Sequence, residues 1–168
     1  MDALLSQGAF FEGLSDEGRR RLLAIVRRRT LATGEYLFLL GDNAADFFVL
    51  VSGKVDLCLP VRLRGVLKDV SVESVRVGQA LGWSALVKPY RFTLSGRATE
   101  PSEVVCLARR DLLDLFEADV SIGYAFFTKV SEVIGIRLLT FQALWVRELQ
   151  RALDSEAQRQ AGESQPPH

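Results

Sequence analysis

The sequence is short of the residues that most metal and haem sites require. Among its 168 residues, the only histidine is the terminal His168, the only methionine is Met1, and there are two cysteines. Haem iron takes axial ligands such as His, Met or Cys, and an iron–sulfur cluster takes several thiolates. The sequence therefore predicts no haem, no iron–sulfur cluster and no other metal cofactor.

A surplus of charge and a long apolar run are also missing. Lys plus Arg and Asp plus Glu number 21 each, so the formal net charge is zero, whereas nucleic-acid binders carry a clustered basic surplus. No segment reaches the roughly 18 consecutive apolar residues of a membrane span. The N-terminal segment carries acids and no apolar core of the kind found in signal peptides. We expect a cytoplasmic protein that binds neither DNA nor membranes.

Catalytic motifs are absent too. There is no internal histidine, no metal-spaced cluster, no nucleophile elbow and no Walker loop, so we do not expect an enzyme. Cys58 and Cys106 lie far apart in apolar runs, which leaves two interpretations open. We favour buried small hydrophobes in a reducing compartment over a disulfide or redox pair.

From about residue 30 to 108 the apolar residues alternate with a period of two. Lys54 to Arg64 predicts a half-buried antiparallel strand, Arg64-Gly65 a turn, and Val66 to Val77 the returning strand with a bulge near Glu73-Ser74. Glycines recur near the strand ends, where tight turns need them. Many short strands with this punctuation predict a β jelly-roll or barrel.

Helical patterns flank the strands, so the fold class is α+β in one domain of residues 1–153. Ser15 is a predicted cap for an N-terminal helix. We expect the arginines at 19–21 and 27–29 to be mostly solvated. Contact of these arginines with anionic lipid or nucleic acid is the less favoured alternative. Asp111 is expected to cap a short helix through Phe116. A long helix is expected from about 119 to 153, followed by a disordered tail at 154–168.

The loops around the first strands resemble those of the cyclic-nucleotide-binding domain family, which includes the catabolite-activator regulators. The similar stretches are Phe11 to Ser15, Gly34 to Phe38, Gly41-Asp42 and Phe47 to Val55. The resemblance covers about residues 8 to 153. It implies a ligand-sensing regulatory module for a cyclic nucleotide or another small anionic effector.

The family's phosphate-binding cassette corresponds to Gly78 through Ala98. The resemblance implies a short helix after Gly82, whose backbone N–H groups at Ser84, Ala85 and Leu86 face a phosphate. Thr93 stands where the family has a hydroxyl that donates to the phosphate.

Two positions depart from the family pattern. Trp83 stands where the family has a Glu that accepts from the ribose, and Phe92 stands where it has an Arg that pairs with the phosphate. Arg91 comes one residue early, which on a strand places it on the opposite face, although a loop shift would bring it inward. We expect weakened binding of cyclic AMP.

The long helix carries an apolar stripe at steps of three and four residues. The resemblance places Arg137 and Leu138 near the family's base-capping positions; Arg137 is either a lid cation for a different anion or a solvated or ion-paired residue. The aromatic residues of the stripe serve either as lid or as dimer seam, and we favour a homodimer because an apolar stripe on a long helix needs a partner. The predicted dimer seam consists of Phe127, Ile134, Leu138, Phe141 and Trp145.

Two functions remain open at this level. The favoured one is a stand-alone regulatory sensor that signals through its C-terminal helix to an effector protein not identified by the sequence. The alternative is a ligand-free dimeric scaffold that keeps the fold. DNA binding is not expected, because a short polar tail follows the long helix where catabolite-activator-type regulators carry a helix-turn-helix domain.

Overall fold

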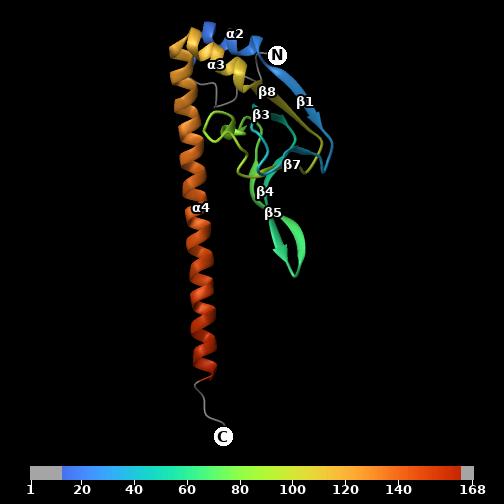
Figure 1. Cartoon of the computed structure of the whole chain (residues 1–168), viewed down its shortest axis with the longest axis vertical. Helices are drawn as coiled ribbons and strands as arrows, with labels where there is room; N and C mark the ends of the chain where they lie inside the picture. The colour runs from blue at the N-terminus through green and yellow to red at the C-terminus, as the bar shows by residue number, and fades with distance from the viewer. Residues whose placement is uncertain (1–12, 164–168) are drawn as a thin grey trace. The chain divides into compact units, whose positions relative to one another are not determined.

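The computed structural model describes residues 13–163, which form a strand-rich unit ending at Val130 and a helical unit beginning at Ser131 (Figure 1). The first two residues of the Phe11 to Ser15 motif and the last five of the predicted tail lie outside the described residues. Each unit is described by itself below.

Helix α2, Asp16–Ala24, begins as the sequence predicts. The Ser15 hydroxyl accepts from the Gly18 amide at 3.0 Å and caps the helix. The helix packs on the start of α4, since a Cβ at Gly18 would lie 3.1 Å from Cγ1 of Ile122. The expected arginine face is shorter than predicted, because Arg27–Leu31 forms strand β1 instead.

Two four-stranded antiparallel sheets form the jelly-roll-like barrel, as predicted. One sheet has the order β1-β8-β3-β6 and the other β2-β7-β4-β5 (Figure 1). The remaining strands are β2 (Tyr36–Phe38), β3 (Asp46–Ser52), β4 (Val55–Leu63), β5 (Val66–Val75), β6 (Ala80–Leu81), β7 (Ser95–Ala98) and β8 (Ser102–Ala108).

The β4–β5 hairpin follows the sequence prediction closely. Its turn residues Arg64 and Gly65 have φ of +49° and +83°, the left-handed conformation that tight hairpin turns require. Leu57 pairs with Glu73 and Cys58 with Ser71, so β5 carries one extra residue. The predicted bulge is therefore confirmed and lies at Val72, next to the expected position.

The core lies between the sheets and beneath the first turns of α4. Phe47 and Phe126 are almost completely buried, and their ring centroids lie 5.1 Å apart in an edge-to-face arrangement. This contact joins β3 to the first part of α4, within the strand-rich unit. The free cysteines Cys58 and Cys106 are both buried and lie in different sheets. Desolvation raises the pKa of the Cys106 thiol to about 11, which suits a small hydrophobe.

The two C-terminal helices differ from the prediction at their ends. Helix α3, Arg109–Ala118, begins earlier than expected, with Asp111 inside its first turn rather than at the cap. Helix α4, Val120–Glu163, begins where predicted but continues ten residues past the expected end. Residues 154–163 are rich in Ala, Glu, Gln and Arg, which favour helix and outweigh their polarity.

Five of the six arginines of α2 and β1 are paired with acids, and Arg19 makes no ion pair among the described residues. In β1, Arg27 bonds Asp46 at 3.1 Å, Arg29 bonds Glu35 at 3.0 Å, and Arg28 bonds Glu103. In α2, Arg20 pairs with Glu17 and Arg21 with Asp119. These pairs neutralise most of the charge of the two arginine runs, which supports the expected structural role over binding of anionic lipid or nucleic acid.

Candidate functional site

The cassette links β6 to β7 and begins with a turn that only glycine fits. Gly82 has a φ of +76°, and a Cβ there would lie 2.9 Å from Cδ2 of Phe48 and 3.1 Å from the Asp46 carbonyl oxygen. The chain can therefore turn tightly against β3 and start the short 3₁₀ helix η2, Trp83–Ala85.

The amide donors of this helix differ from those the resemblance implied. The Ala85 N–H donates to the Gly82 carbonyl and the Leu86 N–H to the Trp83 carbonyl, both at 2.9 Å. Residues 13–163 offer no backbone acceptor to the N–H groups of Trp83 and Ser84. A ligand acceptor here would meet Trp83 and Ser84, because a helix of this kind leaves only its first amides unbonded.

Phe92 fills the position of the expected phosphate-pairing cation. Its side chain is 6% exposed, and its ring stacks on Phe38 with centroids 4.0 Å apart and planes 14° apart. Phe48 lies 6.4 Å away, and the Phe38 ring also covers Gly96, where a Cβ would lie 2.8 Å from Cζ. The surroundings of the Phe92 ring are therefore aromatic and uncharged.

Arg91 and Phe92 differ in exposure although they are adjacent in the chain. Arg91 is exposed, and its Nη1 donates to the Gly41 carbonyl at 2.7 Å. Backbone bonds fix this arrangement: the Phe92 N–H donates to the Asp42 carbonyl at 3.0 Å, and the Gly41 N–H donates to the Phe92 carbonyl at 2.8 Å. Arg91 is thus held by the Gly41 loop rather than turned toward the aromatic side.

The other cassette residues are placed less favourably for an anion. Ser84, Ala85 and Leu86 are buried, Trp83 is half-buried, and Thr93 is exposed beside the buried Phe92. No Asp or Glu occurs between residues 77 and 99, so this segment offers no carboxylate for a ribose hydroxyl.

The comparisons with known proteins agree with this geometry. A family model described as the cyclic nucleotide-binding domain matches residues 28–119, more than half of the chain. The chain belongs to the cyclic nucleotide-binding domain family. Domains of this family are generally regulatory rather than catalytic. A search of curated proteins finds no match.

Solved structures of cyclic nucleotide-binding domains share the fold. A domain from Methylobacillus flagellatus KT is 18% identical with a TM-score of 0.72, over 89% of this chain and 83% of that one. The N-terminal domain of a Streptomyces coelicolor A3(2) transcriptional regulator is 24% identical with a TM-score of 0.65, over 82% and 94%. The Thermus thermophilus catabolite activator protein is 24% identical with a TM-score of 0.62, over 88% and 62%.

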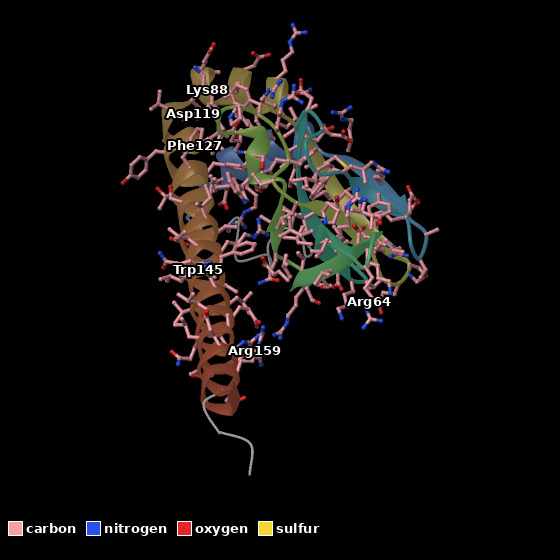
Figure 2. All side chains as sticks on the ribbon, turned by 60° about the horizontal axis from the view of Figure 1, so that its bottom comes forward. Arg64, Lys88, Asp119, Phe127, Trp145 and Arg159 are labelled. Atoms are coloured by element: carbon pink, nitrogen blue, oxygen red, sulfur yellow. The ribbon has the colours of Figure 1, made fainter. Side chains whose placement is uncertain are left out.

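Sequence reasoning missed the partners that make Phe92 part of the core. Phe38 and Phe48 lie in β2 and β3, where consecutive residues are buried on both faces and the sequence shows no alternation that would mark them. Tyr90 was also missed; its ring lies 4.5 Å from the Arg109 guanidinium carbon, and Arg109 donates to the Ala44 carbonyl. Figure 2 shows the side chains of this region on their ribbons.

The predicted lid and seam residues lie on α4. Phe127 belongs to the strand-rich unit, where its ring centroid is 5.6 Å from that of Phe116. In the helical unit, Arg137 is buried and Trp145 is 68% exposed (Figure 2). Their roles as lid and dimer seam stay predictions, as do those of Ile134, Leu138 and Phe141.

Within residues 13–163, no group of three or more His, Cys, Asp or Glu side chains could hold a metal ion. The helices of this part of the chain also include none that is both long and apolar enough to cross a bilayer.

Proposed function

We propose that this cyclic nucleotide-binding domain is a regulatory sensor module that no longer holds cyclic AMP in the family's usual way. The observation that carries the proposal is Phe92, buried in an aromatic stack at the position where the resemblance implies a phosphate-pairing arginine. Trp83 likewise replaces the carboxylate that would accept from the ribose. A charge-assisted hydrogen bond contributes about 1.5–3 kcal/mol. Losing the bond to the phosphate and the bond to the ribose therefore lowers the affinity for cyclic AMP by about two to four orders of magnitude.

The ligand of such a cassette would be held by backbone rather than by side-chain charge. The N–H groups of Trp83 and Ser84 are the available hydrogen-bond donors. The half-exposed indole of Trp83 offers a surface on which a ligand ring would stack. A small anionic or neutral effector with an acceptor group fits these donors. Arg137 would supply a cation only if the lid prediction holds.

The output of the module is proposed to pass through a homodimer of α4 in the cytoplasm. Leu138 and Trp145 are 57% and 68% exposed, as expected of side chains that await a partner. The stripe steps by three, four and four residues, an 11-residue repeat of about 3.67 residues per turn, which favours nearly straight or slightly right-handed helix pairing. Its members are Phe127, Val130, Ile134, Leu138, Phe141, Trp145, Leu149 and Ala152.

A ligand-free scaffold is the second candidate, and the same aromatic stack favours it. Phe38, Phe48 and Phe92 pack as core residues do, and core packing needs no ligand. Under this hypothesis the domain is retained for dimerisation and for contact with an effector protein.

Isothermal titration calorimetry separates the candidates. The native chain is titrated with cyclic AMP, cyclic GMP and cyclic dinucleotides, with the variants Trp83→Ala and Arg91→Ala alongside. A sensor binds one member of the panel and binds it more weakly in Trp83→Ala, which removes the indole but keeps the backbone donors, while Arg91→Ala binds as the native chain does. Tight binding of cyclic AMP contradicts the degenerate cassette, and no binding across the panel supports the scaffold.

A further inference from the structure

The β4–β5 hairpin extends beyond the other strands of the barrel (Figure 1). The eight residues around its turn, 61–68, have the sequence Val-Arg-Leu-Arg-Gly-Val-Leu-Lys and are called the hairpin tip here. The hairpin tip carries three cations and no acid in a chain whose net charge is zero. It is therefore a local basic site at an exposed end of the strand-rich unit.

The cations of the hairpin tip differ from the arginines of β1 in having no partner among the described residues. Within residues 13–163, the side chains of Arg62, Arg64 and Lys68 make no ion pair and no hydrogen bond. By contrast, all three arginines of β1 are paired with acids. Arg64 is labelled at the end of the hairpin in Figure 2. Unpaired cations complement an anionic partner.

Exposed aliphatic side chains accompany these cations on both faces of the hairpin. Val66 is 58% exposed and Leu67 is 62% exposed. Leu67 lies opposite Arg62, and Val61 lies opposite Lys68 in the next row, so these two pairs point to opposite faces. Each face thus presents one aliphatic residue beside one cation.

This arrangement distinguishes among anionic partners. A nucleic acid is disfavoured, because the hairpin tip itself has no aromatic residue to stack on bases. An acidic protein segment would dock on one face and leave the other exposed to water. A lipid interface surrounds an inserted turn on all sides, with acyl chains for the aliphatic residues and headgroup phosphates for the cations.

We propose that the hairpin tip docks reversibly on an anionic membrane surface. Val66 and Leu67 enter the interface, while Arg62, Arg64 and Lys68 contact headgroup phosphates. With three cations, the interaction is weak for one chain and stronger when two copies present two tips to the same surface. Salt weakens it, because the cations are exposed and screened.

Co-sedimentation of the full chain with vesicles tests the proposal. Vesicles of equimolar phosphatidylcholine and phosphatidylserine are expected to sediment the chain at low salt, whereas phosphatidylcholine vesicles are not. The triple variant Arg62→Gln/Arg64→Gln/Lys68→Gln is expected to bind about a hundredfold more weakly, since each cation contributes about a factor of five. Failure of the native chain to bind anionic vesicles overturns the proposal.

A matched variant separates the hairpin tip from net charge. Lys54→Gln/Lys88→Gln/Arg110→Gln removes three exposed cations elsewhere in the same unit and is expected to bind as the native chain does. An equal loss in both triple variants would assign binding to net charge and overturn the proposal. Capture by immobilised polyglutamate without vesicle binding would assign the tip to an acidic protein instead.

Fluorescence tests insertion directly. In Leu67→Trp the new indole is expected to shift to shorter wavelength and to be quenched by brominated acyl chains in anionic vesicles. The native chain, with Trp83 and Trp145 alone, is the control and is expected to change little. An unshifted and unquenched Leu67→Trp that still sediments would refute insertion and leave only surface charge attraction.

Discussion

Replacing Phe92 with alanine tests whether the inner side of the cassette is packed core or open ligand site. The Phe92 side chain is 6% exposed and stacks on Phe38 at 4.0 Å. A buried Phe→Ala change costs about 3–5 kcal/mol, because the transfer free energy of the ring is lost and a cavity remains. The aromatic contacts of Phe92 place the expected loss in the unfolding free energy toward the upper part of that range, at about 4 kcal/mol.

Urea unfolding followed by far-UV circular dichroism measures this loss at a fixed protein concentration. Thr93→Ala is the matched control, since Thr93 is the exposed neighbour and its replacement is expected to stay within about 0.5 kcal/mol. A Phe92→Ala loss below about 1 kcal/mol would refute the reasoning. It would mean that the ring is not held by its neighbours and that the position is free to face a ligand.

Three further predictions concern the turn, the seam and pH. Gly82→Ala is expected to cost about 2 kcal/mol or more of unfolding free energy in urea, since it adds left-handed strain and a close contact with Phe48; Gly65→Ala, with open space around it, should show the strain alone. Trp145→Glu is expected to shift sedimentation velocity from dimer to monomer, and an unchanged dimer would remove Trp145 from the seam. Asp119 accepts hydrogen bonds from Ser121 that lower the pKa of its carboxyl group. The ionised Asp119 therefore stabilises the fold above the ordinary pKa of 3.8, and this stabilisation is lost as the pH falls below that value. The melting temperatures of Asp119→Asn and the native chain should therefore converge in acid.

Much of the barrel could be predicted from local pattern because its strands alternate and its turns need particular residues. The β4–β5 hairpin is the clearest case: Arg64-Gly65 adopts left-handed angles, and the slip of the apolar register marks the bulge at Val72. The Ser15 cap is similar, since the hydroxyl acts on an amide three residues away. In each case the signal and the structure it determines lie within a few residues of each other.

The details of the cassette could not be predicted in the same way, because they depend on contacts between distant segments. Phe92 is buried by Phe38, which lies more than fifty residues earlier in the chain. The Arg91 side chain is held by the carbonyl of Gly41, again a distant segment. The sequence shows that a phenylalanine stands at position 92, where the family resemblance implies an arginine. It does not show that the Phe92 ring packs on Phe38.

The arginines show what a net charge of zero leaves out. A net charge of zero is a sum, and it does not distinguish cations that face acids from cations that face water. In β1, Arg28 lies opposite an acid-bearing strand and bonds Glu103, whereas Arg62 and Arg64 lie where the neighbouring residues are aliphatic. Pairing removes charge from the surface field and leaves the unpaired cations to dominate their own region. Asp69 directly follows the hairpin tip and accepts a hydrogen bond from the Tyr36 hydroxyl, whereas residues 61–68 themselves carry three cations and no acid.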